Sequence, residues 1–91
     1  MSTKFQEEVL DQLIDESEDL RDLMVYNDDF NTFEHVIATL IKVCKHEQHQ
    51  AEQCTYLVHY KGKCSVKRGS FNELKPMKDG ICEAGIKAAI K

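Results

Sequence analysis

One amphipathic helix constrains the fold of this 91-residue chain more than any other feature. Its apolar side chains recur at intervals of three and four residues: Phe33, Val36, Ile37, Leu40, Ile41 and Cys44. This spacing predicts a helix over residues 32–45 with one buried face. Asn31 and Glu34 match a capping box, so we expect Asn31 to be the N-cap. A helix with one apolar stripe needs a second layer to cover that stripe.

Apolar patterns, caps and chain breakers predict five further elements: a strand over 21–26, a helix over 47–60, a strand over 63–67, a helix over 76–84 and a strand over 86–90. Gly62 is expected to end the second helix. Ser70 and Glu73 form a second capping box that opens a brief turn, and Pro76 suits the first turn of the last helix. The order β-α-α-β-α-β predicts an α+β fold, a small α/β sandwich in which helices pack on one face of a three-stranded sheet.

Charge divides the chain into two parts. Residues 1–30 hold ten of the sixteen acidic residues and two of the twelve basic ones. An acidic leader on a mildly basic body does not fit a nucleic-acid binder. A short helix in the leader would be marginal in water by itself. We therefore expect residues 1–19 to be a flexible acidic N-terminal tail and residues 20–91 to be the core domain.

Targeting signals are not apparent. No apolar run approaches the length of a membrane helix, and the N-terminus has acids where a signal peptide has a basic and an apolar region. The sequence predicts a soluble, cytoplasmic protein with no membrane and no nucleic-acid partner.

Four cysteines and four histidines suggest a zinc- or thiol-dependent regulatory domain as one hypothesis. Cys44, His46, His49 and Cys54 come nearest to a ligand set, but their spacing is irregular and contains no CxxC pair. No catalytic or nucleotide-binding motif is present either. The sequence therefore predicts no metal, no cofactor and no enzymatic activity. A ribosome-associated interaction domain is a further alternative, by fold analogy alone.

Polar side chains at two places suggest a site for an amine. Asn27 and Asp29 follow the first predicted strand, and His59 lies near the end of the second predicted helix. A carboxylate, an amide oxygen and an imidazole nitrogen can accept the three N–H groups of an ammonium ion. Apolar Phe33, Val36 and Val58 are close to them in sequence. This set would suit a chain end with a free amine and a large hydrophobic side chain.

Two segments, LMVYNDDFNTFEHVIATL and AEQCTYLVHYKGKC, resemble the ClpS family of adaptors for Clp-type proteases. The resemblance covers residues 20–91 and keeps the family's spacing from Val36 to His59. It implies a non-enzymatic adaptor that binds N-degron proteins beginning with Leu, Phe, Tyr or Trp. Such an adaptor passes its substrates to the N-domain of an AAA+ unfoldase of the ClpA or ClpC type.

The resemblance also implies roles for particular residues. Those that would hold the α-amino group and the first peptide unit are Asn27, Asp28, Asp29, Asn31 and His59, with Asp28 serving the junction more than the ligand. Those that would line the side-chain pocket are Phe33, Val36, Thr55, Val58 and Ile86. Glu73 and Lys78 match positions that dock on the unfoldase. Thr55 replaces a Met that limits which side chains enter, and Phe33 replaces a Met at the rim.

Overall fold

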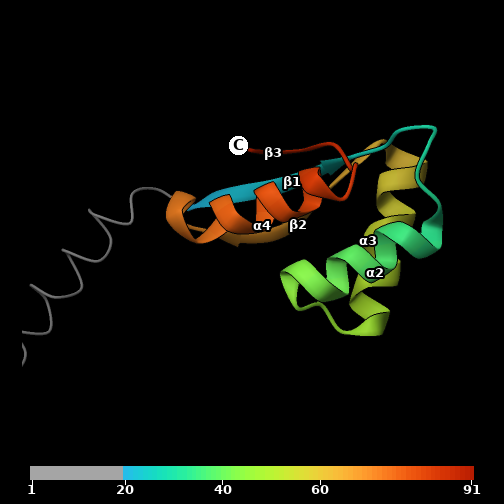
Figure 1. Ribbon diagram of the computed structural model, residues 1–91, viewed down its shortest axis with the longest axis horizontal. Coiled ribbons are helices and arrows are strands. Elements are labelled where there is room, and N and C mark those ends of the chain that lie inside the picture. Colours follow the sequence, from blue (N-terminus) through green and yellow to red (C-terminus); the bar gives the residue numbers. More distant parts are fainter. Residues whose placement is uncertain (1–19) are drawn as a thin grey trace, which may run out of the picture.

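The computed structural model describes residues 20–91, and the predicted tail over residues 1–19 lies outside this part (Figure 1). Its elements follow the predicted order: β1 (Arg21–Tyr26), α2 (Phe33–Cys44), α3 (Gln48–Lys61), β2 (Lys63–Gly69), α4 (Phe71–Glu83) and β3 (Ala88–Ile90). The α+β prediction is confirmed. None of the helices in residues 20–91 is both long and apolar enough to span a membrane.

β1 is the central strand of a three-stranded antiparallel sheet with the order β2-β1-β3. Leu23 and Val25 are fully buried, because alternate residues of β1 face the helices. A β-bulge between Leu23 and Met24 leaves Val66 of β2 without an opposite residue. The carbonyl of Val66 accepts a hydrogen bond of 2.7 Å from Nε2 of buried His46, so the loop between α2 and α3 is tied to the bulge.

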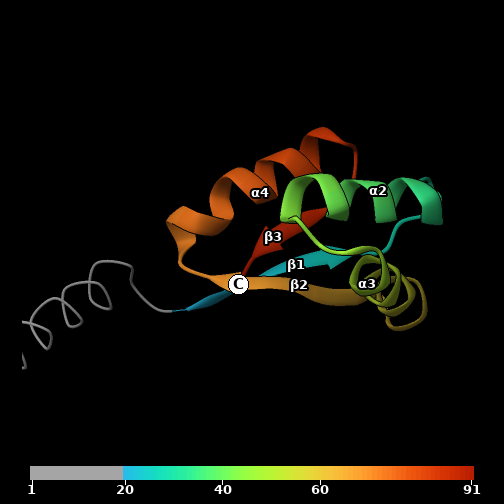
Figure 2. The same ribbon diagram turned by 90° about the horizontal axis from the view of Figure 1, so that it is seen from below.

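The helices are arranged around this sheet as two groups. α2 and α4 lie side by side over one face, and α3 crosses the end where β1 finishes and β2 begins (Figures 1 and 2). The largest fully buried side chains come from β1, α2 and α4: Leu23, Val25, Leu40, Cys44, Leu74 and Ile81. The core therefore sits between the sheet and α2 and α4, as the apolar stripe of α2 predicts.

The N-cap of α2 corrects the sequence prediction by one residue. Thr32 is the N-cap, and its hydroxyl accepts a hydrogen bond of 3.1 Å from the backbone N–H of His35. Asn31 was expected there, but its side-chain amide donates instead to Asp28 and to the carbonyl of Gly85. Both residue types can cap a helix, and a partner distant in sequence decides between them.

The start of α4 differs more from the prediction. The helix begins at Phe71, and Pro76 lies inside it rather than in its first turn. Ser70 caps the helix, so its capping box opens the helix itself and not a separate turn. A proline in a helix interior costs about 3 kcal/mol. Leu74 and Ile81 are completely buried, which contributes about 1.5–3 kcal/mol for each side chain and offsets the cost of the proline. Leu74 precedes Pro76, so it belongs to the helix only because the helix starts before the proline.

The two later strands differ in length from their predictions. β2 continues to Gly69, past the expected end at residue 67, because its last residues pair with the start of β1. β3 is only three residues long, and Ile86 and Lys87 precede it.

We expect Ser70→Ala to lower the free energy of unfolding by about 1 kcal/mol, because the N–H of Glu73 loses its acceptor. Ser70→Asp keeps an acceptor at the same place and serves as the matched control. Urea denaturation of both variants measures the difference. Equal stability of Ser70→Ala and the wild type would contradict Ser70 as the cap of α4.

Candidate functional site

The junction loop, residues 27–32, joins β1 to α2 and is held by one carboxylate. Asp28 Oδ1 accepts hydrogen bonds from the backbone N–H groups of Phe30 (2.9 Å) and Asn31 (3.0 Å). Asp28 Oδ2 accepts another, of 2.7 Å, from the side-chain amide of Asn31. With three local donors, this carboxylate shapes the loop and is not free to face a ligand.

These hydrogen bonds also change the acidity of Asp28. The N–H of Phe30 lowers the pKa of the Asp28 carboxyl below its usual value, and the two donors of Asn31 act in the same direction. Desolvation opposes them but does not prevail. Asp28 is therefore ionised at neutral pH and holds the junction loop as an anion.

The junction loop is tied to the turn that follows α4. The side-chain amide of Asn31 donates to the carbonyl of Gly85 (2.9 Å), and His35 Nε2 donates to the carbonyl of Ala84 (2.8 Å). Gly85 has a φ of 87°, a conformation that a residue with a Cβ rarely adopts. The next residue, Ile86, is buried. The two hydrogen bonds hold this turn next to the junction loop and the start of α2, so Ile86 lies near the loop although it is far from it in sequence.

The end of α3 meets the junction loop through a second glycine. Gly62 has a φ of 90° and donates its N–H to the carbonyl of Val58, which closes the helix as predicted. Its own carbonyl accepts a hydrogen bond of 2.9 Å from the N–H of Asn27. The last turn of α3, with Val58 and His59, is thereby brought beside the residues that follow β1.

Two small adjoining cavities lie where these segments meet, each of about 20 Å³. Both are lined by Asn27, Asn31, Val36 and Val58. One is completed by Tyr26, Asp28 and Ile86. The other is completed by Thr32, Phe33, Thr55 and His59. All five residues predicted for the side-chain pocket line one cavity or the other, as do all residues predicted for the amine except Asp29.

Asp29 lies outside the cavity walls but in the same loop. It is exposed, and it takes no part in the ion pairs of residues 20–91, which use Asp22 and Asp79 as their acids. Unlike the neighbouring carboxylate of Asp28, it can meet a cation from solvent. The two adjacent acids of the junction loop therefore have different environments.

Aromatic rings from α2 and α3 surround the outer side of this site. Phe33 is edge-to-face with Tyr56 (5.3 Å between centroids) and with His59 (4.9 Å). Tyr60 is edge-to-face with His59 (5.0 Å) and stacked parallel to Tyr56 (5.7 Å). Each of these four residues thus contacts two of the others, and we call Phe33, Tyr56, His59 and Tyr60 the ring cluster. Contacts with Phe33 and Tyr60 orient the imidazole of His59.

Sequence reasoning missed three residues of this region: Tyr26, Tyr56 and Tyr60. Tyr26 is the last residue of β1. The alternation of side chains along the strand predicts which face of the sheet Tyr26 lies on, but not that a cavity lies beside it. Tyr56 and Tyr60 are one helical turn apart, so their shared face was readable from the sequence. Their nearness to Phe33 was not, because it depends on how α2 packs against α3.

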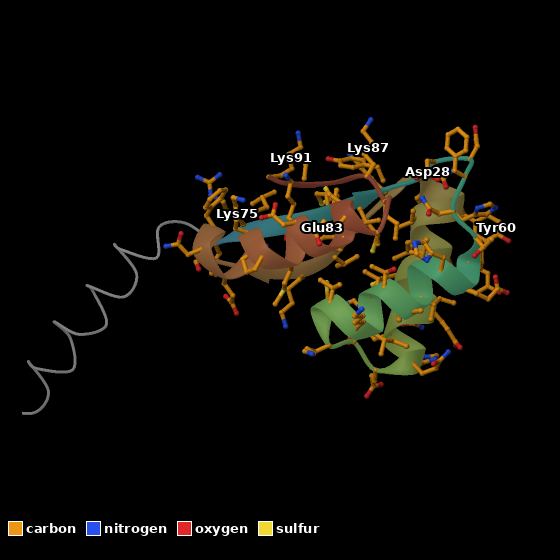
Figure 3. All side chains as sticks on the ribbon, viewed as in Figure 1. Asp28, Tyr60, Lys75, Glu83, Lys87 and Lys91 are labelled. Carbon is orange, nitrogen blue, oxygen red and sulfur yellow. The ribbon has the colours of Figure 1, made fainter. Side chains whose placement is uncertain are left out.

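Glu73 and Lys78, predicted to dock on an unfoldase, are both on α4. Glu73 belongs to its first turn and is exposed, and the amine of Lys78 lies 3.9 Å from Asp79 Oδ1. Lys75, which lies between them in sequence, is at one end of the molecule, while Asp28 and Tyr60 are at the other (Figure 3). The structure does not bring these two residues to the cavities.

A much larger hollow, of about 480 Å³, lies between α2 and α4. Its walls include His35, Lys42, Val43, Gly80 and Glu83, and none of the residues that line it is a predicted site residue. Size alone does not make it the candidate site. The small cavities are where polar acceptors and buried apolar side chains converge.

Two of the four cysteines, Cys44 and Cys64, are poorly suited to a zinc- or thiol-dependent site. Burial raises the pKa of the Cys44 thiol to about 11, and burial with nearby Cys54 raises that of Cys64 to about 12. These two thiols are protonated at neutral pH, and the thiolate is the nucleophile and metal ligand. Within residues 20–91, no three His, Cys, Asp or Glu side chains are grouped to hold a metal ion.

Known proteins resemble this chain in sequence and in fold. A family model described as ATP-dependent Clp protease adaptor protein ClpS matches residues 16–88. The ATP-dependent Clp protease adapter protein ClpS of Thermosynechococcus vestitus is 35% identical over 68 residues, which cover 74% of this chain and 72% of that protein. The solved structure of Agrobacterium tumefaciens ClpS2 bound to L-phenylalaninamide has a TM-score of 0.68 and 22% identity, over 79% of this chain and 94% of that one. At that identity the likeness shows the fold.

The fold and the matches define a protease adaptor without catalytic activity. The chain belongs to the ClpS family of ATP-dependent Clp protease adaptors. The resemblance seen in the sequence is thus confirmed, and it supersedes the zinc- or thiol-dependent and the ribosome-associated alternatives.

We expect Asp28→Ala to lower the melting temperature, because the N–H groups of Phe30 and Asn31 lose their acceptor. A carboxyl with a lowered folded-state pKa stabilises the fold above its unfolded pKa, and this stabilisation disappears as the pH falls through the folded value. The difference between wild type and variant should therefore be present at about pH 7 and shrink towards about pH 2. Asp29→Ala, in the same loop, is the control and should change the melting temperature less. An equal effect of both variants would contradict a special role of Asp28 in the loop.

Proposed function

We propose that this chain binds proteins that begin with a free α-amino group and a large hydrophobic residue, and that it delivers them to a Clp-family AAA+ unfoldase. The observation that carries the proposal is that Asn27 and His59 line one cavity together with Val36 and Val58, while Asp29 is exposed in the same junction loop as Asn27. The ligand of the A. tumefaciens relative supports it, since L-phenylalaninamide has a free amine beside a benzyl group.

Recognition of the amine follows from the chemistry of the mouth. An ammonium group donates three hydrogen bonds and accepts none. Asp29 supplies a negative charge, Asn27 an amide oxygen and His59 a ring nitrogen. Asp28 is occupied within the junction loop, so it contributes by holding Asn27 and Asp29 in place. Asn31, whose amide nitrogen is also occupied, keeps its side-chain oxygen available to the first peptide unit.

Recognition of the side chain follows from the cavity walls. Val36, Val58 and Ile86 are all buried and apolar, and the hydroxyl of Thr55 is satisfied by the carbonyl of Ala51 (2.7 Å). None of these four residues needs a hydrogen bond from the ligand, so the cavity favours an apolar ligand side chain.

The volume of the cavities sets a condition on binding. Each has room for about one water molecule, which is too little for Leu, Phe, Tyr or Trp. The two cavities must therefore merge and open outward when a side chain enters. Phe33 is the half-buried rim residue whose rotation would enlarge the mouth.

Delivery is assigned to other surfaces of the molecule. We assign the contact with the N-domain of a ClpA- or ClpC-like unfoldase to Glu73 and Lys78 on α4. Lys75, which lies between them on α4, is at the opposite end of the molecule from Asp28 and Tyr60, so this arrangement leaves room for a substrate and an unfoldase on one adaptor (Figure 3). The acidic tail, residues 1–19, is assigned to delivery and not to peptide binding.

Acetylating the peptide N-terminus tests the proposal. It removes the cation and covers Asp29 without a partner, which typically costs ~2–5 kcal/mol. Because Asp29 is exposed before binding, the lower end applies, and affinity for a Phe-initiated peptide should fall about 30-fold. Titration calorimetry with free and acetylated peptides gives the ratio.

Substitutions provide the matched control for this experiment. Asp29→Asn should weaken the free peptide strongly and shrink the effect of acetylation. Glu34→Gln removes an exposed acid from the first turn of α2 and should leave both affinities near wild type. Equal binding of the free and the acetylated peptide by the wild type would overturn the proposed function.

Thr55 gives a second prediction, on selectivity between side chains. Thr55 is buried in α3 and lines the cavity, where family members have a longer Met. We expect Thr55→Met to increase the penalty against N-terminal Ile relative to Leu, because a longer side chain crowds a β-branched ligand. A difference of this size in an apolar pocket is worth about 10–200-fold.

The experiment measures the affinities of wild type and Thr55→Met for Leu-, Ile- and Phe-initiated peptides. Phe33 is larger than the residue usual at the rim, so it fills part of the space beside Thr55 and reduces the expected change in the Leu/Ile ratio. Thr55→Val removes the hydroxyl but keeps the shape, and it should leave the Leu/Ile ratio near wild type. An unchanged ratio in Thr55→Met would mean that residue 55 does not control selectivity here.

A further inference from the structure

Two tyrosines of the ring cluster are exposed although their contacts are ordered. Tyr56 is 52% exposed and Tyr60 is 71% exposed, and their rings are stacked within 8° of parallel. They lie one turn apart on α3, outside the core between the sheet, α2 and α4. The fold therefore gains little from these two large apolar rings, while exposed aromatic groups are common in binding surfaces.

The tyrosine pair is continuous with the mouth of the cavity. Phe33 and His59 line the cavity, and each of them touches one member of the pair: Phe33 touches Tyr56, and His59 touches Tyr60. The tyrosine pair therefore does not line the cavity itself but packs against two residues that do. Tyr60 and Asp28 are found at the same end of the molecule (Figure 3).

We propose that Tyr56 and Tyr60 form a second subsite, which receives an aromatic side chain at the third position of the bound peptide. This inference rests on the proposed function. In an extended peptide, alternate side chains point to the same side, so the third follows the first at a step of about 6.6–6.8 Å. The ring of Phe33, which lines the cavity, has its centroid 5.3 Å from that of Tyr56, so the tyrosine pair begins about one such step from the cavity wall.

An aromatic occupant fits the chemistry of the pair best. Tyrosine rings present apolar surface to solvent, and aromatic pairs gain from stacked or edge-to-face contacts in addition to buried area. A short or charged side chain would leave most of that surface wet. Tyr56 and Tyr60 already adopt these geometries with each other and with their neighbours, so little ordering is required when the ligand binds.

Fluorescence anisotropy with C-terminally labelled peptides tests the subsite. Four peptides share one linker and begin Phe-Ala-Ala, Phe-Ala-Tyr, Phe-Tyr-Ala and Phe-Ala-Leu. We expect Phe-Ala-Tyr to bind about two- to tenfold more tightly than Phe-Ala-Ala, and more tightly than the other two. Tyr60→Ala and Tyr56→Ala should bring this ratio towards one, and Tyr60→Phe should retain it.

Leu57→Ala is the matched control, since Leu57 is also exposed on α3 but is outside the ring cluster. It should keep the wild-type ratio. If Phe-Ala-Ala binds but Phe-Ala-Tyr has the same affinity, the subsite is overturned and the proposed function stands. If no Phe-initiated peptide binds, both fail. A gain at the second position only, or a gain that survives both tyrosine substitutions, also overturns the subsite.

Discussion

The carboxylate of Asp28 is the contact on which the rest of the site depends. It collects three donors from Phe30 and Asn31, and this folds the junction loop back on itself. The loop in turn presents Asn31 to the carbonyl of Gly85. One side chain therefore sets the end of β1, the start of α2 and the turn before β3, and the lowered pKa of Asp28 keeps it charged while it does so.

Two glycines then bring the remaining walls to the junction loop. Gly62 ends α3 in a left-handed conformation and accepts from Asn27, and Gly85 turns the chain so that Ile86 is buried. A residue with a Cβ would be strained at either place. The candidate site is thus assembled by hydrogen bonds of the backbone and of Asp28 and Asn31, and we propose that Asp29 and His59 bind the ligand. The neighbouring acids Asp28 and Asp29 therefore differ: Asp28 supports the junction loop through hydrogen bonds, and Asp29 is exposed to solvent.

The sequence predicted the order of elements well because each short segment carries its own signal. The apolar stripe of α2 and the glycine that ends α3, Gly62, appear in the structure as expected. Ser70 is a cap as predicted, but it caps the helix α4 and not a brief turn. The errors fall where two local signals compete. Pro76 was read as a helix start, but the capping box at Ser70 and the burial of Leu74 place the start five residues earlier. Asn31 and Thr32 could each cap α2, and only the position of Gly85 explains why Thr32 does.

The sequence by itself determined the fold class, the family and the residues that could recognise an amine. Periodicity, capping and motif spacing are local properties, so they can be read along the chain without coordinates. Only the tertiary structure decided which of these residues share a cavity wall, why Asp28 supports the loop while Asp29 stays exposed, and that Phe33, Tyr56, His59 and Tyr60 form one cluster. The physical reason is that hydrogen bonds and ring contacts join groups by distance in space, and the packing of α2, α3 and the turn after α4 sets that distance.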